Sequence, residues 1–466
     1  MTSRTRWWTF AVVCAALFMS MLDNLVVLTA LPAIRRSLHA GVPDLEWTVN
    51  AYTLSFAVLM MTGAALGDRF GRKRIFLLGV ATFTIGSALA ATSDGATTLS
   101  MARAVQGVGA AFLTPLTLTL LTRVFPENRR AAAIGLWSGI SGLGLAIGPL
   151  VGGAIVSGIS WNAIFWLNVP VGVLVVCLGW LRLEESFGDR KPLDLPGLLL
   201  AGFGLLGIVY GLVRGNSVGW SSLEITCALA GGTALLATFV WWERRSRTPM
   251  LQLSLFKVRQ FSAANGVGFL MSAGMFGSIF LLTLFIQQIQ GANPLEAGLK
   301  TMPWTGTIML VAPIAGIFAG RIGPRLLVTA GMISQATALL WIGILAHAGT
   351  AYPVLLPAFL LGGLGMGLTY APLSAGVMAA VSDNRQGEAS GAYNAIRELG
   401  GVFGVAVLGA VFQHVATSKL SFVDGFHTAV FAGAGVVLLG VFAALFLSGS
   451  RLTGSPATAE TTLAAA

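Results

Sequence analysis

The chain has 466 residues, of which 55% are hydrophobic and only 10% are charged, and its mean hydropathy is +0.81. These values lie well above those of soluble domains, which excludes water as the solvent for most of the chain. The net charge of +10 would also suit a protein that binds nucleic acid. The basic residues, however, occupy short gaps between apolar segments rather than one face of a soluble domain. We therefore expect a membrane protein with no nucleic-acid partner.

Fourteen apolar segments are long enough to cross a membrane as helices, since a helix needs about 20 apolar residues to span the hydrocarbon core. Strands of a membrane barrel would instead alternate polar and apolar residues over about ten positions. The first segment continues to Leu31 without a small-residue cleavage site, so it is expected to be a retained span. We predict an all-α integral membrane protein whose segments begin near residues 8, 46, 75, 98, 131, 161, 197, 223, 261, 296, 325, 352, 387 and 426.

The distribution of Lys and Arg predicts the orientation of these helices. If the N-terminus is cytoplasmic, the cytoplasmic gaps receive 21 basic residues and the opposite gaps receive five. Only Arg103 and Arg397 fall inside predicted helices. Cytoplasmic loops of membrane proteins carry the excess of basic residues, so both termini are expected to be cytoplasmic.

An internal repeat appears at an offset of 256 residues and carries the fourth and fifth segments onto the twelfth and thirteenth. This shift of eight helices predicts two six-helix bundles, residues 1–190 and 251–450, around a two-helix insert at 191–250, with a cytoplasmic tail at 451–466. Parallel repeats with a substrate path at their interface are typical of transporters. The matches pair Gly107 with Gly363, Gly109 with Gly365, Asn128 with Asn384, Arg129 with Arg385, Gly135 with Gly391, Gly144 with Gly400, Gly148 with Gly404 and Gly153 with Gly409.

The gap between the second and third segments reads GDRFGRKR, residues 67–74. A tight turn at Gly71 would hold the basic residues at the cytoplasmic surface and place Asp68 at the end of the second helix. There Asp68 could accept hydrogen bonds from Arg69, from Arg72 or from the amino end of another helix. Topology alone explains the basic residues, but it does not explain Asp68 and Gly71.

Asp23 is a lone carboxyl group in the first segment, in the stretch LDNLVVLTALP, about eight residues or 12 Å from the outer end of that segment. A carboxylate at such depth costs roughly 2.5–3.5 kcal/mol on insertion scales, so it usually faces a cavity and has a function. Burial disfavours its charged form, which makes Asp23 a candidate to bind and release a proton. A structural hydrogen bond to a neighbouring backbone is the alternative.

Arg103 opens the stretch RAVQGVGAAFLTP in the fourth segment and lies roughly 8 Å below the outer surface. Because this depth is similar to that of Asp23, we hypothesise that the two side chains are within reach and that protonation of Asp23 loosens the pair. Alternatively, Arg103 extends to the outer headgroups.

The fifth segment carries GLWSGISGLGLAIGPLVGG, residues 135–153. Glycines at this spacing let helix backbones touch, and Pro149 bends the helix where a hinge or seal would be useful. An ordinary tight helix crossing explains the glycines but not the Gly-Pro step.

Arg397 and Glu398 lie about ten residues into the thirteenth segment, near mid-membrane. Adjacent residues of a helix project about 100° apart, so we expect that they do not pair with each other and that each has a partner elsewhere. Glu398 is the second candidate for proton binding or cation recognition, and a structural ion pair with another helix is the alternative. Further polar or aromatic side chains that could line a substrate cavity are Gln106, Gln287, Gln288, Trp304 and Asn394.

On these motifs the chain resembles the major facilitator superfamily, and within it the fourteen-helix drug:proton antiporters, over residues 7–448. Ala64 departs from the superfamily's loop pattern, which usually has glycine there, although Gly63 is adjacent. The resemblance makes that loop a latch that stabilises one face of the transporter, through Gly67, Asp68, Arg69, Gly71, Arg72 and Lys73. The fifth segment fits the antiporter signature, which accompanies export, at Gly135, Gly144, Gly148, Pro149, Gly152 and Gly153.

The resemblance implies a proton-driven exporter of lipophilic or cationic small molecules in the lipid of a bacterial cytoplasmic membrane. We expect a monomer that uses the proton gradient and neither a cofactor nor a metal. A dedicated exporter of one self-made metabolite is the alternative within transporters. A membrane-embedded enzyme would require clustered His, Asp or Ser groups at one depth, which the sequence does not show, so we expect no enzymatic activity.

Overall fold

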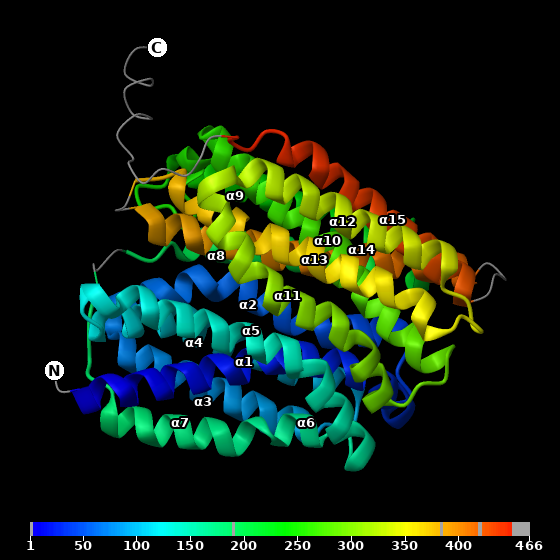
Figure 1. Ribbon diagram of the computed structural model, residues 1–466, viewed down its shortest axis with the longest axis horizontal. Coiled ribbons are helices and arrows are strands. Elements are labelled where there is room, and N and C mark those ends of the chain that lie inside the picture. Colours follow the sequence, from blue (N-terminus) through cyan, green and yellow to red (C-terminus); the bar gives the residue numbers. More distant parts are fainter. Residues whose placement is uncertain (1–2, 189–191, 383–384, 418–421, 450–466) are drawn as a thin grey trace.

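The computed structural model describes residues 3–188, 192–382, 385–417 and 422–449, and every regular element within them is a helix. Figure 1 shows two layers of long helices that cross the molecule in the same general direction. The first layer contains α1 (Ser3–Leu38), α2 (Val42–Phe70), α3 (Arg72–Ala91), α4 (Ala96–Val124), α5 (Glu127–Gly158), α6 (Ala163–Trp166) and α7 (Asn168–Arg182). We call these helices the N-terminal half.

The second layer is the C-terminal half, which follows a two-helix insert and a short 3-10 helix, η1 (Leu253–Lys257). The insert consists of α8 (Leu195–Val218) and α9 (Leu223–Arg245). The half itself contains α10 (Arg259–Gln288), α11 (Pro294–Ile322), α12 (Pro324–Leu345), α13 (Tyr352–Ala379), α14 (Gln386–Thr417) and α15 (Phe422–Ala444).

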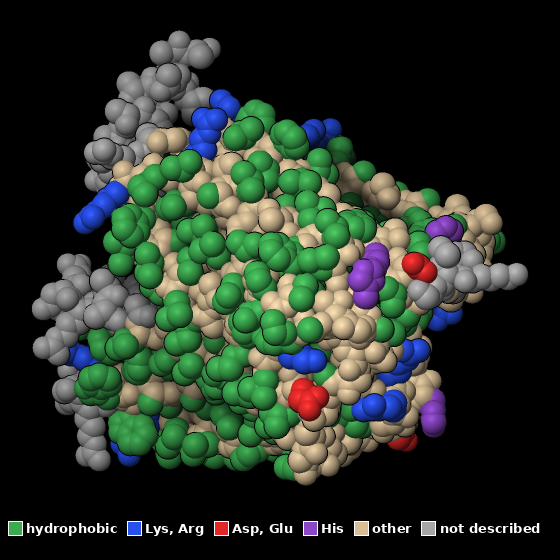
Figure 2. Space-filling model, turned by 45° about the vertical axis from the view of Figure 1, so that its right-hand side comes forward, with side chains coloured by type: hydrophobic (Ala, Val, Ile, Leu, Met, Phe, Trp, Pro, Cys, Tyr) green, Lys and Arg blue, Asp and Glu red, His purple; other side chains and the backbone are tan. Residues whose placement is uncertain are grey.

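The described residues contain 14 helical segments that are long and apolar enough to cross a membrane, with α6 and α7 together forming the sixth. The predicted number of spans is therefore confirmed. Figure 2 shows apolar side chains over the broad middle of one face, whereas most of its charged side chains lie toward the two ends. Large hydrophobic residues such as Leu223 and Leu181 are mostly exposed on this surface, as expected for helices that face lipid.

The first span is longer than the sequence suggested. Its apolar run was expected to end at Leu31, but α1 continues through Pro32 to Leu38. Asp23 consequently lies 15 residues from the end of the helix, which is about 22 Å along its axis. The predicted depth of 12 Å was wrong because polar residues at the end of the segment, Arg35 and Arg36, remain helical.

The two halves repeat the same packing scheme, which confirms the internal repeat. In the N-terminal half α1 packs on α5 and α2 packs on α4, and in the C-terminal half α10 packs on α14 and α11 packs on α13. The repeated glycines explain these contacts. A Cβ at Gly107 would overlap the backbone of Tyr52, and a Cβ at Gly363 would overlap the backbone of Trp304, so each glycine permits a close helix crossing.

The halves meet along two lines of contact related by the repeat, α5 against α11 and α14 against α2. Helix α1 begins and α15 ends at one end of the bundle, on the left in Figure 1, which we call the near end. The opposite end is the far end. The insert covers the α2–α14 line, because an apolar cluster joins Leu54 of α2 and Val402 of α14 to Val209 of α8.

Candidate functional site

A buried ion pair occupies the interior of the N-terminal half. The Arg103 Nη1 atom of α4 lies 2.5 Å from the Asp23 Oδ2 atom of α1, and each side chain is only 2% exposed. The structure thus brings together the two side chains that were placed at similar depths. Since both charges are removed from water, each depends on the other for its stability.

Amide and hydroxyl groups complete the surroundings of Asp23. Its Oδ1 atom accepts hydrogen bonds from Asn168 Nδ2 at 2.8 Å and from Gln106 Nε2 at 3.3 Å. Both amides also contact the hydroxyl of Ser87, and Arg103 donates to Gln106 Oε1. The group therefore joins α1, α3, α4 and α7. Sequence reasoning missed Ser87 and Asn168, because a single Ser or Asn in an apolar helix carries no spacing signal.

Aromatic rings enclose the guanidinium group of Arg103. Its Cζ atom lies 4.3 Å from the ring centre of Tyr52 and 5.8 Å from that of Phe165, distances at which a cation is attracted to the ring face. Its Nε atom donates to the carbonyl of Thr48. The alternative in which Arg103 extends to the outer headgroups is therefore wrong. Tyr52 also interacts electrostatically with Glu398 of the other half, so it lies between the two candidate proton sites.

Arg397 and Glu398 form an ion pair with each other, and the expectation that they would not is wrong. The Arg397 Nη2 atom lies 2.7 Å from Glu398 Oε1. Although the two Cα–Cβ bonds diverge, the long arginine side chain bends back and reaches the neighbouring carboxylate. Arg397 also lies over the ring of Tyr370, 5.3 Å from its centre. The pair is partly exposed, unlike Asp23 and Arg103.

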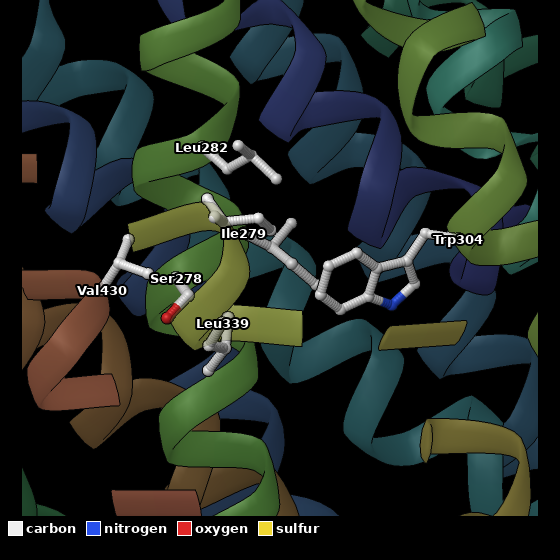
Figure 3. A pocket seen from close by; sticks show the side chains of 7 residues that line it. Ser278, Ile279, Leu282, Trp304, Leu339 and Val430 are labelled. Atoms are coloured by element: carbon white, nitrogen blue, oxygen red, sulfur yellow. The ribbon is translucent and has the colours of Figure 1, made fainter. Parts of the chain in front are cut away.

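The candidate cavity residues do not share one cavity. Gln106 is fully buried in the group around Asp23. Gln287 and Gln288 contact the other half, as described below. Asn394 donates to the carbonyl of Ser390 on its own helix. Trp304 lies inside the C-terminal half, where its indole faces a narrow apolar pocket (Figure 3) lined by Ser278, Ile279, Leu282, Leu339, Ile342 and Val430.

The turn between α2 and α3 is built around Gly71, whose φ of 111° favours glycine. The Glu185 carboxylate, from the segment after α7, accepts hydrogen bonds from the backbone N–H groups of Lys73 and Arg74 at the start of α3. A negative group is stabilised at such a helix N-terminus. A Cβ on Gly71 would lie only 2.7 Å from this carboxylate, so the glycine also provides space. Sequence reasoning missed Glu185, since its partners are more than 100 residues away.

Asp68 bonds within its own half in this conformation. Its carboxylate accepts from Arg72, one turn further along, at 2.8 Å, and its carbonyl accepts from the N–H of Gly188. Lys73 donates to the carbonyl of Trp180. Arg69 lies over the neighbouring Phe70 ring. A Cβ on Gly67 would overlap Leu116 of α4, so this glycine allows α2 and α4 to approach. Whether the loop acts as a latch stays a prediction.

Glycines of the fifth span let α5 touch helices of both halves. Positions 144, 148 and 152 face α1. A Cβ on Gly153 would overlap the backbone of Pro294 in α11, and a Cβ on Gly298 of α11 would overlap that of Pro149. The Gly-Pro step thus lies where the two halves meet. Gly135 belongs to the same helix.

Hydrogen bonds join the two halves at the far end, and we call this region the far seam. Gln287 donates to the carbonyl of Thr29 at 2.9 Å, and Arg35 donates to Gln288 Oε1 at 2.6 Å. The other bonds of the far seam are Thr305 to the carbonyl of Ala146, the N–H of Leu295 to Ser157 and Gln413 to Glu46. The far seam is therefore closed in this structure.

Comparison with known proteins agrees with this architecture. The profile of the family described as Major Facilitator Superfamily matches residues 13–405 and 266–463. Multidrug resistance protein Stp of Mycobacterium tuberculosis (strain CDC 1551 / Oshkosh) is 36% identical over 411 residues, which cover 88% of this chain and 76% of the relative. The Tetracenomycin C resistance and export protein of Streptomyces glaucescens is 33% identical, covering 87% and 76%.

Another relative, the Methylenomycin A resistance protein of Bacillus subtilis (strain 168), is 32% identical over 89% of this chain and 90% of its own. Among solved structures, a bacterial homologue of the human lysosomal transporter Spinster, inward-facing and unoccupied, superposes with a TM-score of 0.69. It covers 98% of this chain and 100% of its own at 15% identity. This last likeness concerns the fold alone.

Proposed function

Because the chain belongs to the Major Facilitator Superfamily and within it to the multidrug and antibiotic efflux transporters, we propose that it exports lipophilic or cationic small molecules in exchange for protons. The observation that carries the proton part is the Asp23 carboxylate, which is 2% exposed and bonded to Arg103 in a membrane-spanning half. Ionisable residues at this depth are costly and usually serve transport or proton relay.

The contacts of Asp23 suggest how a proton would change the conformation. When a proton binds a carboxylate oxygen, the attraction that holds Arg103 at 2.5 Å is lost, while Asn168 and Gln106 can still bond the neutral group. Arg103 then remains held by Tyr52 and the Thr48 carbonyl of α2. Protonation therefore loosens α1 from α4 without loosening α2 from α4, and this differential effect shifts the balance between two conformations.

Glu398 is the second proposed site, for a proton or for a cationic substrate. It is paired with Arg397 but less deeply buried than Asp23, and it interacts with Tyr52 across the halves. A cation that approached Glu398 would compete with Arg397. Substrate and proton would thus act on groups that face each other through one tyrosine.

The excess of basic residues at the near end supports cytoplasmic termini and insertion in a bacterial cytoplasmic membrane. The far seam then lies on the outer side, and its closure corresponds to an inward-facing state. Asp68, at the inner side, would exchange its contacts with Arg72 and Gly188 for contacts with the other half when that side closes.

Transport in inside-out vesicles with an imposed pH gradient tests the proposal. Wild type should accumulate dyes or antibiotics from a panel and lose this ability when the gradient is collapsed. Asp23→Asn should abolish gradient-driven accumulation, whereas Glu224→Gln, at an exposed carboxyl of the insert, should retain it. Accumulation that survives collapse of the gradient would remove proton coupling, and a fully coupled Asp23→Asn protein would remove Asp23 from it.

A dedicated exporter of one self-made metabolite is a second candidate, and the tetracenomycin C and methylenomycin A relatives favour it. The same panel separates the two possibilities, because a multidrug exporter accepts chemically unrelated compounds. Neighbouring genes for a biosynthetic pathway, together with transport of a single compound, would support the dedicated exporter.

A further inference from the structure

Glu46 is a carboxyl group fully buried in the far seam. It lies near the start of α2, its exposed fraction is 0%, and it faces α14 of the other half, where a Cβ on Gly409 would overlap its carboxyl group. It was not among the residues singled out from the sequence, since it stands next to polar residues at the edge of an apolar segment and reads there as a surface residue.

The hydrogen bonds of Glu46 are incomplete. Its Oε1 atom accepts one bond, from Gln413 Nε2 of α14 at 2.7 Å. Its Oε2 atom is buried and has no hydrogen-bond partner among the described residues. An ionised carboxylate has about four acceptor positions, so most of them would be left unsatisfied here.

The charged groups on the helices around Glu46 are engaged elsewhere. On α2 itself, Asp44 accepts from the N–H of Gly41. Arg103 of α4 pairs with Asp23, and Arg214 of α8 lies near Glu224 and over the ring of Tyr210.

On the other neighbours of α2, Arg35 of α1 donates to Gln288, and the basic residues of α3 lie at the near end. His414 of α14 follows Gln413 and is exposed. The contacts of Glu46 in the described part of the chain therefore consist of one amide and a glycine of the other half, and they include no cation.

A buried carboxylate without a counter-ion is strongly disfavoured relative to the neutral acid. The closed far seam thus fits a protonated Glu46. When the seam opens, α2 separates from α14, water reaches the group, and it ionises as an exposed glutamate does above about pH 4.3. Closing the seam takes up one proton, and opening it releases one.

We propose that Glu46 is a proton-binding site of the far seam, through which acidity on that side of the membrane favours closure of the two halves. The proposal rests on the proposed function, because it concerns the same alternating cycle. The proton returns to the side from which it came when the seam reopens, so Glu46 is separate from the transported proton. Since the closed state holds one proton more, the ratio of closed to open seams should rise by up to tenfold for each unit of falling pH.

Distance measurements between two spin labels test this proposal. Gly158 of α5 and Gly349, which precedes α13, lie at the far end of different halves, and each has open space where a side chain would project. Both would be replaced by labelled Cys in full-length protein in which Cys14, Cys177 and Cys227 are replaced by Ala. The distance distribution is recorded in lipid without substrate from pH 5 to pH 8, in an Asp23→Asn background that removes that carboxyl from the response.

In this background the closed fraction should increase as pH falls. Glu46→Gln, which keeps the acceptor for Gln413 and cannot ionise, should make the seam predominantly closed and nearly independent of pH. The control Asp44→Asn, at an exposed carboxyl on the same helix, should keep the pH response. An unchanged response in Glu46→Gln would overturn the proposal, as would a pH-independent seam with Glu46 intact.

Transport by the variants separates this inference from the proposed function. With Asp23 intact, Glu46→Gln should still couple export to the pH gradient, since the transported proton binds elsewhere, but its turnover should no longer depend on outer pH through the seam. Loss of coupling in wild type would refute the proposed function and leave the seam response to be judged by the labels alone.

Discussion

Removal of the Arg103 charge should destabilise the protein strongly. In Arg103→Met the Asp23 carboxylate keeps its bonds to Asn168 and Gln106 but loses the only cation that the structure places against it among the described residues. Breaking a buried pair by removing one partner costs about 3–5 kcal/mol, because an uncompensated charge remains. With both side chains 2% exposed, the free energy of unfolding should fall by an amount in this range.

The double variant Asp23→Asn, Arg103→Met should be more stable than Arg103→Met alone. Neither side chain then carries a charge, and removing both members of a buried pair costs much less than removing one. The interaction energy from the four proteins should be about 2–3 kcal/mol, the upper part of the range for residues in direct contact. Asn at position 23 can still accept a hydrogen bond from Asn168 through its own carbonyl.

Reversible unfolding in mixed micelles with a rising fraction of denaturing detergent gives the four free energies. The matched control is the pair Arg214 and Glu224, whose atoms are 3.9 Å apart and whose side chains are nearly half exposed. Its interaction energy should stay below about 1 kcal/mol. Additive effects of Asp23→Asn and Arg103→Met, or equal interaction energies for the two pairs, would refute the reasoning from burial.

Two glycine substitutions test the helix geometry in the same unfolding assay. Gly71→Ala should cost about 1–3 kcal/mol, because a side chain at φ 111° is strained and would crowd Glu185. Gly404→Ala should cost a similar 1–3 kcal/mol by overpacking, roughly, since its Cβ would overlap the backbone of α10. Gly435→Ala, where the space is open, should be neutral or stabilising by up to about 1 kcal/mol. Equal effects at all three positions would contradict the assigned contacts.

Local and periodic signals in the sequence predicted the helices and their repetition. A run of apolar residues reports a membrane span directly, since the lipid interior permits few other backbone structures. The fixed offset of 256 residues predicted which helices correspond in the two halves, because the same glycines make the same crossings. The proximity of Asp23 and Arg103 followed from equal depth, even though the absolute depth was wrong, since both estimates referred to the outer side.

Contacts that depend on side-chain length or on distant segments could not be predicted in the same way. The pairing of Arg397 with Glu398 contradicts an argument based on Cβ directions, which ignores the reach of a long side chain. The role of Glu185 depends on a segment that returns from the end of α7 to the start of α3. The burial of Glu46 depends on how α14 of the other half approaches, and the spacing within its own segment does not report that approach.

The two-helix insert determines how the far seam can open. Leu54 of α2 and Val402 of α14 touch the same apolar face of α8, and such non-directional contacts can slide at little cost. The Asn216 amide of α8, by contrast, donates at 2.6 Å to the Ala410 carbonyl of α14, and a hydrogen bond of this kind depends on distance and angle. Movement of α2 past α8 and α14 together therefore costs less than separation of α8 from α14. Since Glu46 lies on α2 and faces α14, the movement that opens the seam is also the movement that exposes its carboxyl group.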